Sequence, residues 1–340
     1  MKKTLIALAV AGVVAAPAAF AATSNVDIYG IIDGSVSLVD VEVGGVTLVD
    51  NVQTGNVGNI DASRFGLKGS EDLGGGLKAI WQVESKLSLD DATSIGERNT
   101  FVGLNGGFGT VLIGRHDTPE KLSTAKLDLF ADSVGDYNLS GTILDTREKN
   151  VLAYMSPSFN GFGFAAAAVA GEQTGASAEN DGIADHYSLS ATYENGPLYI
   201  GAGYTSVSAG YELSALKIGG STIDAAYVLL DDADTWRIGA GYSFGNLRLA
   251  GVYQSIELGT LDGGDDSDGY SLGASYTMGN IVLKGQYMSR EDMLEGFAIG
   301  ADYNLSKRTK AYITYTDLSE ENSADDVDVS IASVGVRHSF

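Results

Sequence analysis

Apolar and polar residues alternate along most of the chain in short runs. Uncharged residues occupy every even position of 26–38, whereas Asp27 and Asp33 stand at odd positions between them. The same alternation recurs over 236–244 and 281–287. A period of two predicts β-strands that have one uncharged face. The opposite face is polar along its length, which indicates that these strands border water on that side.

Tyrosines stand at both ends of four predicted hairpins. Four of them directly precede a polar turn, namely Tyr193, Tyr242, Tyr276 and Tyr303. Four more follow those turns by seven residues, namely Tyr204, Tyr253, Tyr287 and Tyr315. Seven residues at a rise of ~3.3 Å and a tilt of ~40° climb roughly 18 Å, comparable to the ~25 Å apolar band of an outer-membrane barrel. Two rings of interfacial aromatics predict an all-β transmembrane antiparallel β-barrel rather than a soluble sandwich.

Connections between the predicted strands are of two kinds. Short turns include 72–76 and 106–109, and longer acidic loops include 40–61, 172–185 and 257–268. Short turns at one rim and long loops at the other are typical of outer-membrane barrels. The pattern predicts a barrel of 16–18 strands. Eighteen is the full count, and the number falls to sixteen if 211–230 is not a spanning hairpin.

The N-terminus has the features of a secretory signal peptide. Lys2 and Lys3 precede an apolar run that ends in the A-x-A site Ala19-Phe20-Ala21. We therefore expect residues 1–21 to be cleaved and residues 22–340 to form a single barrel domain. Without the two N-terminal lysines, 19 basic minus 44 acidic residues leave a charge of −25, which argues against nucleic acid as a partner. The chain has no cysteine, so neither disulfides nor thiolate-bound metals are expected.

Four segments of the chain resemble the general diffusion porins of Gram-negative bacteria. They are SRFGLKG at 63–69, RNTFVGL at 98–104, GTVLIGR at 109–115 and VGVRHSF at 334–340. The resemblance spans the mature chain and implies an outer-membrane channel for passive diffusion of small hydrophilic solutes. It also implies a homotrimer with an inward-folded constriction loop, surrounded by outer-membrane lipid and lipopolysaccharide. By the same resemblance, the barrel-assembly machinery recognises the terminal Phe340.

The connection at about 116–147 is the expected constriction loop, since it is long and contains both charged and apolar residues. Loops longer than ~12–15 residues without structure of their own are usually functional. This one carries Asp128, Asp132 and Asp136, whose spacing of four would place them on one face of a helix. We expect the three carboxylates to face the pore. The alternative is that they are ordinary solvated loop acids.

Basic residues are expected on the wall that faces this loop. Strand parity places Arg64, Lys68, Arg98 and Arg147 on the lumen side. By resemblance, the three arginines match the porin arginine cluster, and structural salt bridges in the lumen are the alternative reading. Ile31 occupies the position where the family often has a further lysine, so the cluster is reduced.

Cations on one wall and carboxylates on the other would create a transverse field that orients water and dipolar solutes. Because the mouth is strongly acidic and Asp128 and Asp132 oppose the cluster, the sequence predicts a weak cation preference that grows as salt falls.

Two other functions stay open at this level. The barrel could be a substrate-selective channel, or a non-conducting structural or adhesive barrel. An enzyme is not expected, since His116, His186 and His338 stand in no pattern typical of a catalytic triad or a metal site. No cofactor or metal is expected. The acidic loops are interpreted as a solvated rim, or as a place where divalent cations bridge to lipopolysaccharide.

Overall fold

A computed structural model describes the fold of the chain. It describes residues 24–55, 63–89, 95–138, 145–171, 182–208, 212–213, 216–218, 221–224, 227–228, 232–258, 266–291, 295–320 and 326–340. The expected signal peptide at 1–21 lies outside these residues. So do parts of several long connections.

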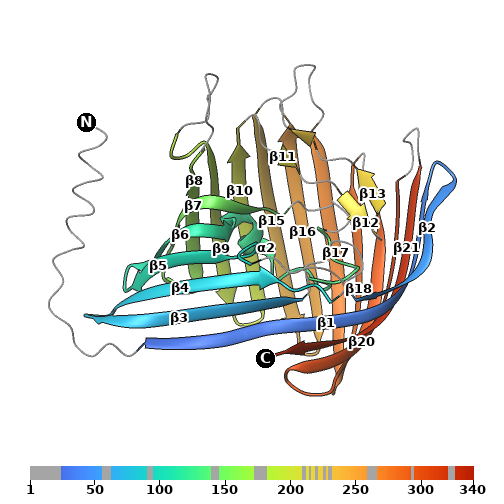
Figure 1. Ribbon diagram of the computed structural model, residues 1–340, viewed down its shortest axis with the longest axis horizontal. Helices are drawn as coiled ribbons and strands as arrows, with labels where there is room; N and C mark the ends of the chain where they lie inside the picture. The colour runs from blue at the N-terminus through green and yellow to red at the C-terminus, as the bar shows by residue number, and fades with distance from the viewer. Residues whose placement is uncertain are drawn as a thin grey trace.

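The main sheet closes on itself as an antiparallel barrel (Figure 1). It has seventeen strands, and β2 pairs only with β1, so sixteen strands form the ring. In ring order these are β1 (Ser24–Val43), β3 (Arg64–Gly74), β4 (Leu77–Lys86), β5 (Thr100–Gly106), β6 (Gly109–Asp117), β7 (Arg147–Met155), β8 (Phe162–Val169), β9 (His186–Asn195), β10 (Leu198–Val207), β15 (Ala233–Phe244), β16 (Leu247–Leu258), β17 (Ser267–Met278), β18 (Ile281–Arg290), β19 (Glu295–Asn304), β20 (Thr309–Glu320) and β21 (Val327–Ser339). Pairing of β21 with β1, from Ser339 opposite Ile31 to Val327 opposite Val43, closes the ring. The predicted all-β barrel is confirmed.

The ring has sixteen strands because the segment at 211–230 adds no spanning hairpin. Strand β10 pairs directly with β15. Between them, β11 (Glu212–Leu213) pairs with β14 (Tyr227–Val228), and β12 (Leu216–Ile218) pairs with β13 (Ser221–Asp224), in two sheets of their own. Strands of two to four residues, at ~3.3 Å each, are too short to cross an apolar band of ~25 Å. The count of eighteen was therefore wrong, and the alternative of sixteen is correct.

The connection expected at 40–61 also contains regular structure. Strand β1 continues for 20 residues, and its end forms a hairpin with β2 (Val46–Gly55). On the same edge, the first half of β1 pairs with β3. The long β1 therefore pairs with β21 on one edge and, on its other edge, first with β3 and then with β2.

The predicted strand parity holds on the outer wall. On β1, Val26, Ile28 and Leu38 are each more than half exposed, whereas Asp33 and Ser37 on the opposite face are buried. An exposed apolar wall of this extent is what lipid contact requires.

Aromatic side chains form a continuous girdle over half of this wall. Eight consecutive strands each contribute one outward aromatic: Tyr187, Tyr204, Trp236, Tyr253, Tyr270, Tyr287, Phe297 and Tyr315. Their rings pack in pairs across neighbouring strands, with centroid distances of 5.2–6.1 Å. Several hydroxyls donate to carboxylates, as Tyr204 does to Asp234 at 2.8 Å. The girdle is the feature that the tyrosine spacing predicted.

The connection from β6 to β7 runs inside the ring. It begins with the short helix α2 (Pro119–Thr124), which Thr118 caps by accepting a hydrogen bond from the backbone amide of Lys121. Helix α2 contacts β9, β10 and β15 and lies within the ring in Figure 1. No helix in the described ranges is long and apolar enough to cross a membrane. The loop therefore fills part of the lumen and contributes Leu127, Phe130, Val134 and Tyr137 to the main buried cluster.

Candidate pore constriction

The first arm of the inner loop is held by a buried carboxylate. Glu120 in α2 is only 2 % exposed, and it accepts hydrogen bonds from Thr235 Oγ1 at 2.6 Å and from Arg237 Nε and Gln254 Nε2 at 3.2 Å. Its backbone amide donates to Ser188 Oγ at 3.1 Å. A buried carboxylate is stable only when such donors replace its water. These bonds fix α2 to the lumen face of β15 and β16.

Arg237 joins both arms of the loop to the wall. Its guanidinium forms an ion pair with Glu120 on the outgoing arm and with Asp145 on the returning arm, the latter at 2.7 Å. It also donates to Thr124 Oγ1 at 3.2 Å. The alternation over 236–244 places Arg237 on the polar face of its strand, but it does not identify the role of this residue. No local pattern could have done so, because Glu120 lies 117 residues away along the chain.

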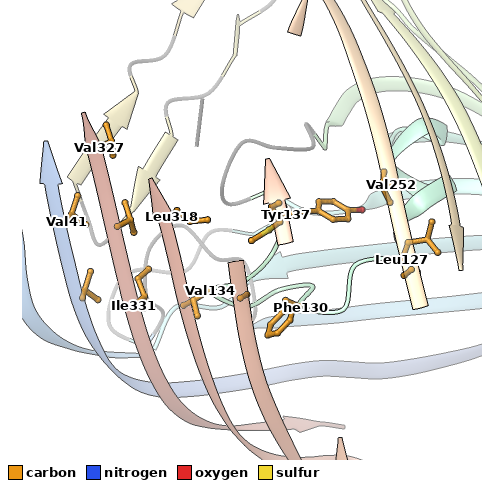
Figure 2. Close-up of a cluster of buried hydrophobic side chains, with 14 of the residues drawn as sticks. Val41, Leu127, Phe130, Val134, Tyr137, Val252, Leu318, Val327 and Ile331 are labelled. Carbon is orange, nitrogen blue, oxygen red and sulfur yellow. The ribbon is translucent and has the colours of Figure 1, made fainter. Parts of the chain in front are cut away.

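Apolar side chains hold the middle of the loop against the wall. Leu127, Phe130 and Tyr137 are buried in one cluster with Val252 and further wall residues (Figure 2). The amide of Gln286 adds polar contacts, since its oxygen accepts from the Leu129 amide and its nitrogen donates to the Gly135 carbonyl. The loop therefore packs along the wall instead of hanging free in the lumen.

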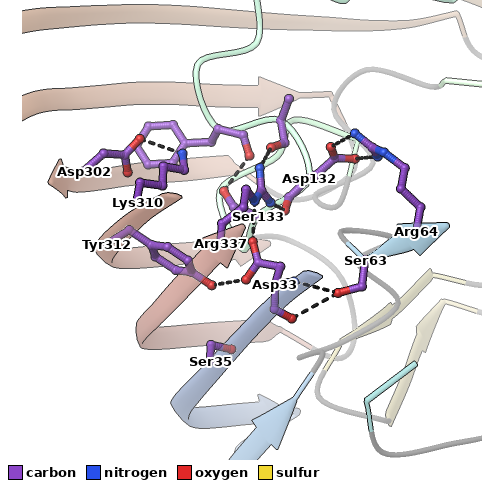
Figure 3. A network of polar contacts seen from close by, with 12 residues as sticks. Asp33, Ser35, Ser63, Arg64, Asp132, Ser133, Asp302, Lys310, Tyr312 and Arg337 are labelled. Atoms are coloured by element: carbon purple, nitrogen blue, oxygen red, sulfur yellow. Dashed lines mark hydrogen bonds and ion pairs between the residues drawn. The ribbon is translucent and has the colours of Figure 1, made fainter. Parts of the chain in front are cut away.

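The loop tip is fixed at Asp132, which has a left-handed backbone with φ 58°. Arg64 on β3 donates to both of its carboxylate oxygens, at 3.1 and 2.9 Å (Figure 3). Arg337 on β21 donates to the backbone carbonyl of Asp132 and forms an ion pair with Asp33. Asp33 also accepts a 2.6 Å hydrogen bond from Tyr312. Two strands that meet β1 from opposite sides thus hold one tip.

The three loop aspartates differ in their partners. Asp132 faces Arg64, and although burial opposes its ionisation, the charge of Arg64 and its hydrogen bonds lower the pKa of Asp132. Asp128 accepts from the Phe130 amide, and Asp136 accepts from the Asp132 and Asn138 amides, all at 2.8 Å. Burial raises the pKa of Asp136 to about 6, and burial with the charge of Asp136 raises the pKa of Asp128 well above its ordinary value. Only Asp132 pairs with the expected arginines.

Each of the other expected cations has its own nearby partner. Arg98 Nε lies 2.6 Å from Glu84, and Arg147 Nε lies 2.9 Å from Asp117. Lys68 is exposed, and its Nζ stands 5.0 Å from the centroid of the Tyr29 ring. Ile31 is opposite Arg64 in the pairing of β1 with β3 and therefore shares its face.

The expected charged residues lie in the same part of the lumen, but the arginines among them form separate ion pairs rather than a single cluster. Arg64 and Asp132 connect the loop to β3, while Arg98 and Arg147 are neutralised by carboxylates of the wall itself. Paired charges of this kind leave a polar, hydrogen-bonding surface with little free charge. Sequence reasoning did not identify Glu84 and Asp117 as partners.

Comparison with known proteins places the chain in a family. The model of the Gram-negative porins matches residues 6–323. Outer membrane porin protein 32 of Delftia acidovorans is 33 % identical over 279 residues, which cover 78 % of this chain and 72 % of that protein. Major outer membrane protein P.IB of Neisseria gonorrhoeae is 28 % identical over 387 residues, with full coverage of both chains.

Solved structures agree with these matches. An anion-selective porin from Comamonas acidovorans has a TM-score of 0.75 and 28 % identity, covering 94 % of this chain and all of that one. The trimer form of OmpT from Vibrio cholerae has a TM-score of 0.64 at 15 % identity, over 94 % of this chain and 100 % of that one, which shows the fold alone. These matches describe a family of channels and not of enzymes. The chain therefore belongs to the Gram-negative porins, and it is an outer-membrane porin that forms a water-filled channel for passive diffusion.

Proposed function

We propose that small hydrophilic solutes and ions pass this porin between the inner loop and the wall formed by β3–β7. The bidentate bond from Arg64 to Asp132 carries this proposal, because it fixes the loop tip at that wall. Arg64, Lys68, Arg98 and Arg147 form the wall side of the constriction. Asp128, Asp132 and Asp136 belong to the loop side, where Asp132 alone presents its charge to the arginines.

We further propose that the constriction itself prefers anions weakly. Asp128 and Asp136 are turned toward loop amides and Asp132 is paired with an arginine, so the loop presents little free negative charge to the basic wall. On that wall Lys68 is exposed, and it stands opposite Asp27 of β1, with no ion pair between these two side chains in the described part of the barrel. The relative from Comamonas acidovorans is an anion-selective porin, in keeping with this reading. The acidic mouth acts in the opposite direction, and its exposed charges are screened within ~8–10 Å at physiological salt. The cation preference expected from the sequence should therefore appear only in dilute salt.

The test is a pair of loop variants measured by reversal potential in planar bilayers under a salt gradient. Asp132→Asn frees Arg64 from its counter-charge, so selectivity should move clearly toward anions at high salt. Asp128→Asn replaces a carboxyl group whose pKa is raised, so this variant should change the selectivity much less. It is the matched control. Equal shifts in the two variants would contradict the assignment of Asp132 as the charged residue of the loop.

We also propose that the protein is a homotrimer whose contact surface includes β21 and β1. The aromatic girdle stops at Tyr315 on β20, and the described outward residues of β21 and β1 near that level are Ser330, Ala332 and Leu38. Gly34, Val36 and Val334 line a groove of about 510 Å³ on this face. A surface of small and aliphatic residues without interfacial aromatics suits a neighbouring protein wall better than lipid. OmpT of Vibrio cholerae, a neighbour in fold, has a trimer form.

The remaining partners are proposed from the exposed wall. Its apolar band fits outer-membrane lipid, and lipopolysaccharide surrounds the outer half. Phe340 lies at the end of β21, where the barrel-assembly machinery would read it. We propose cleavage after Ala21, which the mass of the mature protein would test.

A further inference from the structure

Several wall residues beneath the inner loop are glycines whose missing side chains are replaced by the loop. A Cβ on Gly203 of β10 would lie 2.6 Å from the Cα of Glu120, and one on Gly201 would overlap the backbone carbonyl oxygen of Ser123. On β15, a Cβ on Gly239 would overlap Leu127 Cδ1. Real Cβ atoms do not approach other atoms this closely, so an added methyl group would displace the loop.

The same relation continues along the loop toward its tip. A Cβ on Gly273 of β17 would lie 2.8 Å from Leu129 Cδ1, and one on Gly300 of β19 would lie 3.2 Å from Phe130 Cε1. Glycines on four different strands thus lie under successive parts of one loop. We call Gly201, Gly203 and Gly239 the loop seat, since their clashes would be the most severe.

Other contacts pull the loop onto this seat. The Tyr199 hydroxyl donates to the Ser123 carbonyl oxygen at 2.8 Å, next to Gly201. Arg237, two residues from Gly239, joins both arms of the loop to β15 through Glu120 and Asp145. These bonds hold the loop against the lumen face of the wall, and the glycines determine how closely the loop approaches it.

We propose that the loop seat determines the width of the pore. Without side chains at positions 201, 203 and 239, the loop lies deep against β10 and β15, and the space toward β3–β7 stays open. These glycines are positioning residues, because they act on solutes only through the loop. The inference rests on the proposed function of the loop as the constriction.

The first test replaces Gly201 with alanine and measures single-channel conductance and the smallest excluded polyethylene glycol in planar bilayers. The added methyl group meets backbone, which cannot rotate away, so α2 should move toward the opposite wall. Conductance should fall by roughly a quarter or more, since passage depends steeply on pore width, and smaller polymers should be excluded. The matched control is Gly163→Ala on β8. It shares the lumen face, but a Cβ there would meet only Thr192 Oγ1, at 3.0 Å.

A second test distinguishes displacement of the loop from general damage to the barrel. Gly239→Ala should narrow the pore less than Gly201→Ala, because it meets the end of a flexible side chain. Adding Leu127→Ala in the same chain removes that side chain and should restore conductance toward the wild-type value. If damage to the barrel caused the loss, the second substitution would make it worse.

The outcomes separate this inference from the proposed function. Wild-type conductance in Gly201→Ala, an increase in its conductance, or failure of Leu127→Ala to restore Gly239→Ala would each overturn the loop seat. A variant that lacks residues 126–138 tests the proposed function itself. If its conductance and polymer exclusion equal those of the wild type, the inner loop is not the constriction.

Discussion

At the scale of the residue, environment decides what each loop aspartate does. Asp132 is held by Arg64, which lowers its pKa, whereas Asp128 and Asp136 accept hydrogen bonds from loop amides and have raised pKa values. Three carboxylates with identical spacing in the sequence therefore contribute differently to the field in the pore. Spacing describes where they could lie, and the partners determine their charge.

The raised pKa of Asp136 predicts a pH-dependent selectivity. A carboxyl group is neutral below its pKa and charged above it, so raising the pH through about 6 adds a negative charge to the loop. Reversal potentials should move toward cation preference over this range. Asp136→Asn cannot ionise and keeps one of the two oxygens that accept from the Asp132 and Asn138 amides, and it should flatten the change. A variant that titrates like the wild type would assign the pH dependence to other groups.

At the scale of the element, each ring strand divides its residues between lipid and lumen. Ile238 on β15 is 49 % exposed on the outer wall, while its neighbour Arg237 is buried in the lumen. Substitutions one position apart therefore act through different mechanisms. Gly239, which parity alone would class as a tolerant lumen position, lies under Leu127, so a side chain at this position would displace part of the loop.

Ile238→Arg should impair assembly of the barrel. An arginine on the lipid face near mid-depth costs ~2–4 kcal/mol. The fraction of folded barrel, read from heat-modifiable gel mobility after urea titration, should fall accordingly. Ile238→Val keeps an apolar side chain and serves as the control. Equal assembly of both variants would show that β15 has the opposite orientation.

The C-terminal residue closes the sheet, which predicts a structural effect of its removal. The Phe340 amide donates to the Gly30 carbonyl at 3.1 Å, and the Gly30 amide donates to the Phe340 carbonyl at 3.2 Å. Deletion of Phe340 removes both bonds and the terminal aromatic ring, so less assembled protein should reach the outer membrane. Phe340→Tyr preserves the backbone and an aromatic ring and should assemble well. Normal surface levels of the deletion would refute this role.

At the scale of the whole molecule, the outer wall is divided into an aromatic sector and a sector whose described residues lack aromatics at the level of the girdle. The first extends over β9–β20 and the second includes β21 and β1. Lipid contact explains the first sector, and contact between protomers is proposed for the second.

A homotrimer should therefore be sensitive to bulk in only one of these sectors. Val36→Trp on β1 should yield monomers in mild detergent by light scattering, because tryptophan overfills a close protein contact. Leu272→Trp on β17 adds the same side chain to the lipid-facing wall and should remain trimeric. A monomeric wild type would exclude the proposed trimer, and a trimeric Val36→Trp would move its contact surface elsewhere.

Local patterns in the sequence were enough to predict the barrel, the orientation of its strands and the aromatic girdle. These features follow from a period of two and from turns within hairpins, which are local and can be read within about ten residues. The even positions of β1 and the alternation from Trp236 to Phe244 illustrate this, since both proved to divide the outer wall from the lumen. The number of strands stayed between sixteen and eighteen, because the runs in 211–230 alternate like strands but form described strands of only two to four residues. The sequence also predicted a loop where β1 forms a hairpin with β2.

The contacts between the inner loop and the wall of the lumen, in contrast, depend on the tertiary structure. Arg64 meets Asp132 across 68 residues of chain, and Arg237 meets Glu120 across 117. The direction of Asp128 toward Gln286 and the seating of the loop on Gly201 also depend on which parts of the wall the closed ring brings beneath the loop. No periodicity encodes such contacts, since they depend on closure of the ring and on the path of a loop inside it. Strand faces are thus a local property of this chain, and its constriction is a property of the closed barrel.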